Sequence, residues 1–219
     1  MKKPRVLMAD DHSLILAGLR KLVEGECEVV GTVEDGRALV EAAQKLRPDL
    51  ILLDISMPLL NGLEAAKQLR VLVPESKLIF LTMHASSTYA TEAFQAGASG
   101  YLLKRSAASE LSLAIRSVLQ GQQYLTPSLT KDVLESLLKP SSGEQGKAPS
   151  GALTARQREV LQLVAEGRGT KAIATILNVS VKTVEFHKSR IMQQLDIHTT
   201  ADLTKYAITH GIIGLESAH

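Results

Sequence analysis

The sequence predicts an α/β domain with a doubly wound, five-stranded parallel sheet, followed by a small all-helical domain. Two observations support this prediction. Five short apolar runs alternate with segments of helical spacing, which is typical of a parallel sheet covered by helices on both faces. After a stretch rich in Ser, Gly and Pro at residues 140–152, only helical patterns follow.

Composition excludes several classes of protein. Apolar residues make up 45% of the 219 residues, so a hydrophobic core can form, whereas only 3% are aromatic and Trp is absent. A stacking surface for single-stranded nucleic acid is therefore not expected. No apolar run approaches the ~20 residues of a membrane span, and Asp10 and Asp11 interrupt the N-terminal apolar run before a signal-peptide core could form. We expect a soluble, cytoplasmic protein with no membrane partner.

Cysteine content and net charge narrow the chemistry further. The single cysteine, Cys27, excludes an intrachain disulfide and a multi-cysteine metal site. The formal net charge is only +2 at pH 7. Any binding of nucleic acid therefore does not depend on a large basic surface.

The predicted strands are short and mostly apolar. They are residues 5–9 (RVLMA), 28–33 (EVVGTV), 50–55 (LILLDI), 77–83 (KLIFLTM) and 100–104 (GYLLK). Helices are predicted between them because apolar residues repeat at spacings of three and four, as in Leu39, Ala42 and Leu46. Right-handed crossovers place the carboxyl ends of all these strands along one edge. Ligand sites in such sheets lie in the crevice outside that edge.

Charged and hydroxyl side chains stand at this edge. They are Asp10 and Asp11 after the first strand, Asp54 near the end of the third, Thr82 near the end of the fourth and Lys104 at the end of the fifth. Three carboxylates brought together repel one another and favour a bound cation. Mg²⁺ suits a site with few carboxylates and open water positions. A hydroxyl and an ammonium suit an incoming phosphoryl group, so Asp54 is predicted to be a nucleophile that forms an acyl phosphate.

The stretches ADDH, LLDISMPLLNG, FLTMH and GYLLKR occur in this order. Residues 5–121, which contain them, resemble the flavodoxin-like receiver domain of bacterial two-component response regulators. The resemblance implies that Mg²⁺ is held by Asp10 or Asp11, by Asp54 and by the backbone carbonyl of Ser56. It also implies that Asp54 takes a phosphoryl group from a phosphohistidine of a cognate sensor histidine kinase.

The same resemblance gives roles to three further residues. Thr82 is expected to move toward the phosphate, Tyr101 to turn inward with it, and Lys104 to pair with the phosphate charge. The chain then accepts a phosphoryl group with Mg²⁺-assisted self-catalysis and is not a turnover enzyme on an external substrate. For His84, two residues past Thr82, three interpretations stay open: a general base, a residue that tunes phosphoryl lifetime or access, and a bystander.

Each of these residues, taken singly, also has an ordinary structural explanation. An Asp pair after a strand is often a helix cap, and a lone Lys at a strand end is usually solvated. Thr82 and Tyr101 are common strand residues, and Asp54 could be structural. Their order and placement together favour the functional interpretation.

The predicted helical domain contains a helix-turn-helix pattern. Its first segment, LTARQREVLQLVAEG, begins with a capping box formed by Thr154 and Gln157. The short helix TKAIATIL, the turn NVS and the longer helix VKTVEFHKSRIMQQL follow, with Ser180 as the predicted N-cap of the longer helix. A short helix, a tight turn and a longer helix with a polar outer face form a helix-turn-helix. In that motif the second helix enters the major groove of DNA.

Residues 153–211 resemble the four-helix DNA-binding domain of the LuxR/NarL/FixJ class, through LTARQREVLQLVAEG, KAIATILNVSVKTVEFHKSRIMQQL and TTADLTKYAI. The implied partner is double-stranded promoter DNA. The Glu185 carboxylate can accept a hydrogen bond from the N4 amino group of cytosine. Phe186 either contacts the methyl group of a thymine or belongs to the core. The other candidate contacts, most of them to phosphate, are Lys171, Lys182, Thr183, His187, Lys188, Ser189 and Arg190.

These observations predict three parts: a phosphoacceptor receiver domain at residues 1–121, a linker with a short helix at 122–152, and a LuxR-type helix-turn-helix domain at 153–219. The predicted function is a transcription regulator in which phosphorylation of Asp54 changes receiver conformation, interdomain docking and homodimerisation on DNA. A pseudo-receiver regulated without phosphorylation is the main alternative. A Mg²⁺-dependent phosphatase is disfavoured because Ser56 stands where a second acid is expected, and a helix-turn-helix protein that binds another protein is a third possibility.

Overall fold

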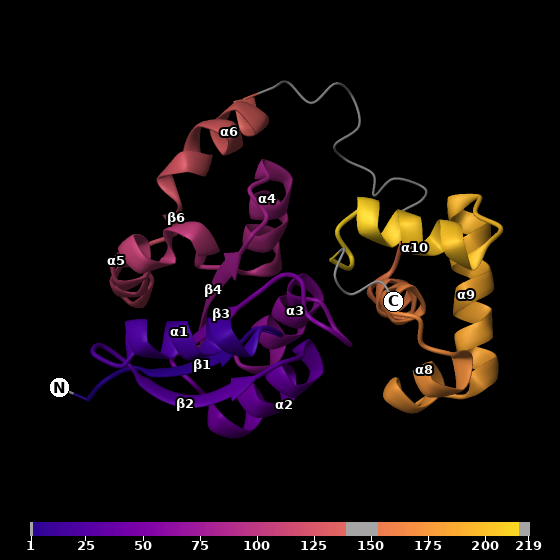
Figure 1. Ribbon diagram of the computed structural model, residues 1–219, viewed down its shortest axis with the longest axis horizontal. Helices are drawn as coiled ribbons and strands as arrows, with labels where there is room; N and C mark the ends of the chain where they lie inside the picture. The colour runs from indigo at the N-terminus through magenta and orange to yellow at the C-terminus, as the bar shows by residue number, and fades with distance from the viewer. Residues whose placement is uncertain (1, 139–152, 215–219) are drawn as a thin grey trace. The chain divides into compact units, whose positions relative to one another are not determined.

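The computed structural model describes residues 2–138 and 153–214. The chain divides into two compact units, one formed by the α/β elements and one by the helices that follow residue 153 (Figure 1). The Ser/Gly/Pro-rich linker predicted at residues 140–152 lies outside the described residues.

The first unit alternates strands and helices along the chain (Figure 1). Its strands are β1 (Arg5–Ala9), β2 (Glu28–Val33), β3 (Leu50–Leu53), β4 (Lys77–Thr82), β5 (Gly100–Leu103) and β6 (Tyr124–Leu125). Its α-helices are α1 (Ser13–Val23), α2 (Gly36–Leu46), α3 (Gly62–Leu72), α4 (Ser87–Ala96), α5 (Ala107–Leu119) and α6 (Pro127–Leu138), with a 3-10 turn, η1, at Lys104–Ser106. The strand order is β2-β1-β3-β4-β5-β6, and all neighbours are parallel. The predicted doubly wound parallel sheet is confirmed.

Helices cover both faces of the sheet. Helices α1 and α5 pack on one face, and α2, α3 and α4 pack side by side on the other. Successive residues of a strand point to opposite faces, so each strand contributes alternate side chains to each layer. The layer under α1 and α5 contains Val6, Met8, Leu50, Leu52, Ile79, Leu81 and Leu102 from the strands, with Leu16, Leu19, Leu111, Ile115 and Val118 from the helices.

The sheet has six strands, so the prediction of five is wrong. The sixth, β6, pairs in parallel with β5 at the edge of the sheet. The backbone N–H of Tyr124 donates to the carbonyl of Ser99 at 3.0 Å, and that of Thr126 donates to the carbonyl of Tyr101 at 3.0 Å. Two residues are too few for an alternation of apolar and polar side chains to appear. Only the backbone pairing with β5 identifies this strand.

The segment after β6 also packs on the first unit. Helix α6 contacts α4 and buries Leu129 and Val133. Just before this helix, Thr126 is 1% exposed, and its Oγ1 accepts a hydrogen bond from the backbone N–H of Leu103 at 3.1 Å. The described part of the predicted linker, up to residue 138, is thus attached to β5 and α4.

The second unit consists of α7 (Ala155–Ala165), α8 (Thr170–Ile176), α9 (Val181–Leu195) and α10 (Thr200–Thr209). Helix α7 contacts each of the other three. Their apolar faces meet in a core of Val160, Leu161, Leu163, Val164, Ile173, Leu177, Val184, Ile191, Leu203 and Ala207. The predicted all-helical domain is confirmed.

Capping residues fix the helix starts as the sequence predicts. The Thr154 hydroxyl accepts from the Gln157 backbone N–H at 3.2 Å, and the Gln157 amide oxygen accepts from the Thr154 N–H at 2.8 Å. The Ser180 hydroxyl accepts from the backbone N–H of Thr183 at 3.1 Å and begins α9. Asn178, with φ of 51°, supplies the left-handed residue in the turn between α8 and α9. Helices α8 and α9 therefore form the predicted helix-turn-helix.

Candidate functional site

Four of the predicted site residues gather at the carboxyl edge of the sheet. Asp10 follows β1, Asp54 follows β3, Thr82 ends β4 and Lys104 follows β5. Asp10, Asp54 and Thr82 are respectively 1%, 5% and 0% exposed. Because β4 lies between β3 and β5, the long side chain of Lys104 extends past β4 to reach the two acids. Strand order, rather than proximity in the sequence, brings these residues together.

Lys104 joins the two buried acids. Its Nζ lies 2.7 Å from Oδ2 of Asp10 and 2.7 Å from Oδ2 of Asp54. Burial of Lys104 disfavours the charged ammonium, but the charge of Asp54 and the hydrogen bonds to both acids outweigh burial and raise the pKa of Lys104. The Lys104 side chain therefore stays positively charged at neutral pH and balances the charge of both carboxylates.

Asp11 adds a third carboxylate to the same edge. Burial is the largest cause that raises the pKa of Asp11. The charge of His12 lowers this pKa, whereas the charges of Asp10 and Asp54 raise it further. Oδ1 of Asp11 is buried and makes no hydrogen bond to the described residues, although it lies 2.9 Å from Nδ1 of His12. Ligand atoms of Asp10, Asp11 and His12 lie within 4.8 Å of one another. This oxygen-rich cluster is the part of the edge best suited to a hard cation.

The loop after β3 folds tightly against Asp54. The backbone N–H of Ile55 donates to Oδ1 of Asp54 at 2.6 Å, and the N–H of Gly62 donates to the carbonyl of Ile55 at 2.8 Å. A Cβ atom at Gly62 would overlap the backbone oxygen of Asp54. Glycine is therefore required at this position because the start of α3 approaches the backbone of Asp54.

Tyr101 already points into the protein. It is wholly buried, and its hydroxyl donates to the backbone carbonyl of His84 at 2.7 Å. Burial, with the charge of Asp54, raises the pKa of Tyr101, so the phenol stays protonated and remains a donor. The backbone N–H of His84 donates in turn to the Thr82 hydroxyl at 3.3 Å. Thr82 and Tyr101, which the resemblance to receiver domains implies to be a switch pair, are thus linked through the backbone of His84.

The His84 side chain connects two loops at this edge. Its Nε2 lies within hydrogen-bonding distance of the Ser56 hydroxyl, at 2.9 Å, and its ring centroid is 4.5 Å from that of Tyr89. Burial lowers the pKa of His84, which favours the neutral imidazole. The sequence left the role of His84 open. Its place two residues after Thr82 was the only signal, because its partner Ser56 is far away in the sequence.

In the second unit, the outer side of α9 presents most of the predicted DNA-contacting residues. Lys182, Glu185, Phe186, Ser189 and Arg190 are exposed, as is Lys171 at the start of α8. Phe186 is 57% exposed, so it is a surface residue and not part of the core. Thr183, His187 and Lys188 are half-buried, and Nζ of Lys188 donates to the Thr200 hydroxyl at 3.1 Å.

Comparisons with known proteins agree with both units. A family model described as the response regulator receiver domain matches residues 6–116, and one described as bacterial regulatory proteins of the luxR family matches residues 151–207. The response regulator UvrY of Escherichia coli K12 is 34% identical over 214 residues, which cover 97% of each chain. The chain belongs to the NarL/FixJ-type response regulators. It is a DNA-binding regulator of a two-component system, with a receiver domain and a LuxR-type helix-turn-helix domain.

Solved structures of another response regulator support this family. A structure of RcsB from Salmonella typhimurium matches with a TM-score of 0.64 and 29% identity, over 95% of this chain and 98% of the other. RcsB has also been solved in complex with DNA, which matches with a TM-score of 0.58 and 28% identity over 94% and 98% of the two chains. A further structure holds two RcsB dimers on two parallel DNAs.

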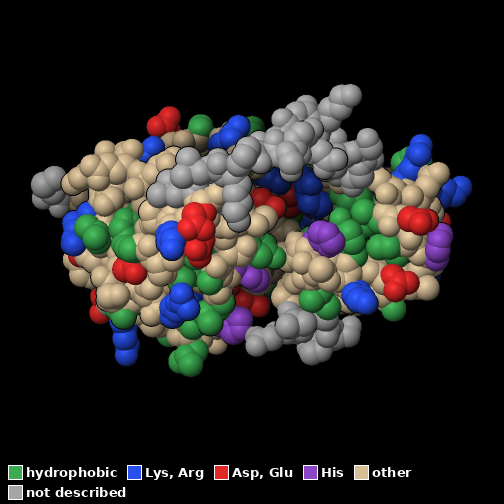
Figure 2. Space-filling view, turned by 90° about the horizontal axis from the view of Figure 1, so that it is seen from above, with side chains coloured by type: hydrophobic (Ala, Val, Ile, Leu, Met, Phe, Trp, Pro, Cys, Tyr) green, Lys and Arg blue, Asp and Glu red, His purple; other side chains and the backbone are tan. Residues whose placement is uncertain are grey.

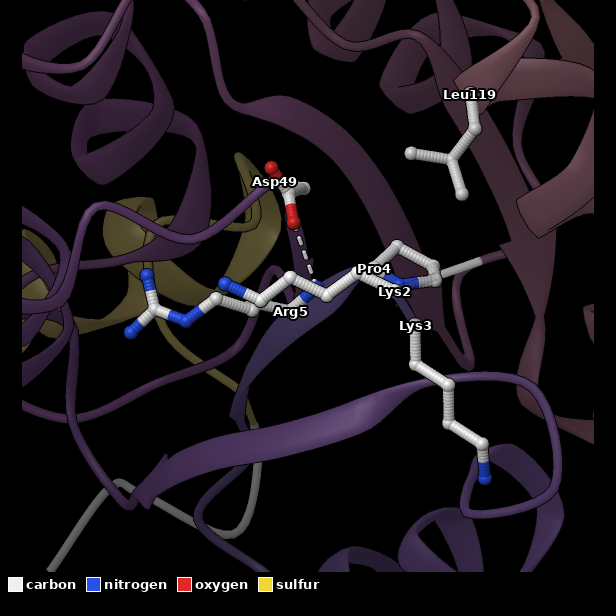
Figure 3. Close-up of a pocket in the computed structure, with 6 residues that line it drawn as sticks. All are labelled: Lys2, Lys3, Pro4, Arg5, Asp49 and Leu119. Atoms are coloured by element: carbon white, nitrogen blue, oxygen red, sulfur yellow. Dashed lines mark hydrogen bonds between the residues drawn. The ribbon is translucent and has the colours of Figure 1, made fainter.

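One hollow in the described part of this response regulator lies away from the predicted site residues. A hollow of about 620 Å³ lies at the amino end of β1, lined by Lys2, Lys3, Pro4, Arg5, Asp49 and Leu119 (Figure 3). There Oδ2 of Asp49 accepts a hydrogen bond from the backbone N–H of Arg5 at 2.7 Å.

On the face drawn in Figure 2, Lys and Arg side chains are interspersed with acidic ones. Among the described residues, no helix has the length and apolar character needed to cross a membrane.

Proposed function

We propose that phosphorylation of Asp54 controls DNA binding by this response regulator. The observation that carries the proposal is the buried pair of ion contacts, each 2.7 Å long, from Lys104 to Asp54 and Asp10. A buried carboxylate whose counter-charge sits on a flexible side chain can exchange that partner when new negative charge arrives. Phosphorylation adds such charge at Asp54.

The acids at the carboxyl edge suit Mg²⁺. The carboxylates of Asp10, Asp11 and Asp54 and the ammonium of Lys104 together carry a formal charge of −2 at this edge, which a divalent cation balances. Oδ1 of Asp11 is buried and makes no hydrogen bond in the described part of the chain, so it can become a ligand if its 2.9 Å contact with Nδ1 of His12 is exchanged for the ion. We assign Asp10, Asp11, Asp54 and the backbone carbonyl of Ser56 as the residues that hold the ion. Bound Mg²⁺ would neutralise phosphoryl oxygens during transfer.

The transfer itself is a nucleophilic displacement. A carboxylate oxygen of Asp54 attacks phosphorus as the phosphorus–nitrogen bond to a histidine of the cognate sensor kinase breaks. The electron pair of that bond leaves with the imidazole. Lys104 then turns from the carboxylates to a phosphoryl oxygen, and the Thr82 hydroxyl donates to another. The chain accepts one group in this way and does not turn over an external substrate as an enzyme.

The output of the switch is binding to double-stranded promoter DNA through α9. Thr82 and Tyr101 are tied to the backbone of His84, so movement of Thr82 toward phosphate changes the loop between β4 and α4. We propose that this change favours a homodimer, which places two α9 helices on two half-sites. RcsB dimers on DNA are consistent with that arrangement. Because its target is promoter DNA, the protein would act in the bacterial cytoplasm.

One observation favours a second candidate, a regulator that works without phosphorylation. The resemblance implies that Tyr101 turns inward after phosphorylation, yet its hydroxyl is bonded inward to His84 in the unmodified chain. A pseudo-receiver held in one conformation would look the same. The two candidates differ in whether Asp54 is modified at all.

Intact mass after incubation with Mg²⁺ and acetyl phosphate separates the candidates. We expect one phosphoryl adduct on the natural chain and none on Asp54→Asn. Asp132→Asn, which removes an exposed acid from α6, is the matched control and should retain the adduct. An adduct on Asp54→Asn would refute the acceptor assignment. A folded natural chain without an adduct would support the pseudo-receiver.

A further inference from the structure

Phe186 is an exposed aromatic side chain in a protein that has few aromatics. It is 57% exposed, and aromatic residues make up only 3% of the chain. The same helix buries Val184 and Ile191 against the core of its domain, so packing of α9 does not need Phe186. Aromatic side chains contribute large apolar contact areas at interfaces, so an exposed phenyl ring on the predicted recognition helix is a candidate contact for the partner of that helix.

Two neighbours hold the Phe186 ring on the outer side of α9. The guanidinium carbon of Arg190, one turn further along the helix, lies 5.6 Å from the ring centroid, within the range of a cation–π contact. The ring of His187 meets that of Phe186 nearly edge-on, with centroids 5.7 Å apart. These contacts favour the observed orientation of the ring, and the residue stays 57% exposed. Phe186 is therefore preorganised on the surface.

The chemistry of the DNA major groove limits what such a side chain can contact. The edges of the bases carry hydrogen-bond donors and acceptors, and the one apolar group among them is the 5-methyl of thymine. Lys182 and Arg190, the cationic residues one turn before and one turn after Phe186, are attracted to phosphates. A phosphate offers no apolar contact to a phenyl ring. An aromatic residue that enters this groove therefore has one natural apolar partner.

We propose that Phe186 contacts the 5-methyl group of one thymine in each half-site, and that Arg190, held over the ring, binds the adjacent phosphate backbone. This inference rests on the proposed role of α9 in the major groove and adds the base that the helix reads. Phe186 is then a specificity-determining residue, because cytosine and the purines present no methyl group at that position. Glu185 and Ser189, exposed on the same side of α9, would contact the neighbouring base pairs.

The experiment removes the methyl group from the DNA without changing base pairing. Full-length protein, treated with Mg²⁺ and acetyl phosphate, selects its preferred sequence from randomised duplex DNA. Each thymine of that sequence is then replaced singly by deoxyuridine, which lacks the 5-methyl group, and affinities are measured by fluorescence anisotropy. For the natural chain we expect about a 3- to 10-fold loss at one thymine per half-site, the scale of one buried methyl group, and little change elsewhere.

Variants identify the residue responsible. Phe186→Ala should bind thymine and deoxyuridine duplexes with equal affinity at the sensitive position, whereas Phe186→Leu should keep part of the preference. Gln193→Ala, exposed near the end of α9 and not among the predicted DNA contacts, is the matched control and should keep all of it. If Phe186 only supports Arg190, Phe186→Ala will bind both duplexes more weakly but retain the preference for thymine, and the inference is wrong.

The remaining outcomes are also decisive. A natural chain that selects a DNA sequence but loses no affinity with deoxyuridine at any position refutes the methyl contact and leaves the DNA-binding role intact. A natural chain that selects no sequence at all refutes the proposed role of α9 together with the inference. The two failures are therefore distinguishable in one series of measurements.

Discussion

Nζ of Lys104 lies 2.7 Å from Oδ2 of Asp54, and both side chains are more than nine-tenths buried. The same ammonium lies 2.7 Å from Oδ2 of Asp10. One cation thus holds two carboxylates that follow different strands. This relationship makes Lys104 both a structural residue of the receiver and the group most directly affected by any new charge at Asp54.

Replacement of Lys104 by methionine should destabilise the receiver when metal is removed. The change leaves two buried carboxylates without their cation, and loss of one partner of a buried ion pair costs about 3–5 kcal/mol. Urea unfolding with EDTA measures the loss. Mg²⁺ should restore more stability to Lys104→Met than to the natural chain, because it supplies the missing positive charge.

Lys131→Met is the matched control for this prediction. It removes a Lys from a solvent-exposed pair with Glu135 on α6, 3.7 Å apart, and such pairs contribute about 0–1 kcal/mol. Equal losses from the two substitutions would mean that the contacts of Lys104 contribute no more than a surface pair.

Asp11 should make the metal-free receiver less stable as pH rises. Burial raises the pKa of Asp11 above its ordinary value of 3.8, so the folded chain binds more protons than the unfolded chain between the two pKa values. The free energy of unfolding from this group therefore falls as pH rises through that window and stays lower above it. Asp11→Asn should raise metal-free stability at neutral pH and lessen its fall across the window.

Glu41→Gln, which neutralises an exposed acid on α2, provides the comparison for Asp11. It should change the metal-free stability little at any pH. Without metal, Asp11→Asn should be more stable than the natural chain at neutral pH; with excess Mg²⁺, the natural chain should be the more stable of the two. The reason is that Asp11→Asn has lost a ligand and gains less stability from the ion. A metal-free Asp11→Asn variant that is less stable than the natural chain at neutral pH would contradict the assignment.

Substitution of Gly62 by alanine should displace the loop that carries Asp54. The added Cβ overlaps the backbone oxygen of Asp54, and overpacking of this kind costs about 1–3 kcal/mol. We expect lower stability and slower phosphorylation by acetyl phosphate, followed by intact mass. Gly18→Ala is the control, since its Cβ meets nothing within 4 Å and it lies inside α1, where alanine stabilises by roughly 0.5–1 kcal/mol.

The Thr126 hydroxyl should contribute to the stability of the receiver. It accepts from the Leu103 backbone N–H at 3.1 Å in a buried position. Thr126→Val keeps the shape but leaves that N–H without its acceptor, at a cost of about 1–3 kcal/mol. Thr126→Ser retains the hydroxyl and should lose less in urea unfolding. If the serine variant is the less stable of the two, the methyl group matters more than the hydrogen bond.

Patterns in the amino-acid sequence were enough to predict the class of fold, the capping of α7 and α9, and the residues that meet at the carboxyl edge. Apolar runs define β1 to β5, and parallel strands must end at the same edge, so Asp10, Asp54, Thr82 and Lys104 could be placed together from their positions alone. These features follow from local sequence patterns and from the general right-handedness of crossovers between parallel strands. Neither requires knowledge of the folded structure.

Four other features became visible only in the folded chain: the pairing of β6 with β5, the inward position of Tyr101, the contact of His84 with Ser56 and the exposure of Phe186. Each depends on partners that are distant in the sequence or on which side of a helix faces the core. The Tyr101 hydroxyl finds the carbonyl of His84 only after β4 and β5 lie side by side. Side-chain direction and edge pairing are set by packing across the molecule, and a local sequence pattern does not contain that information.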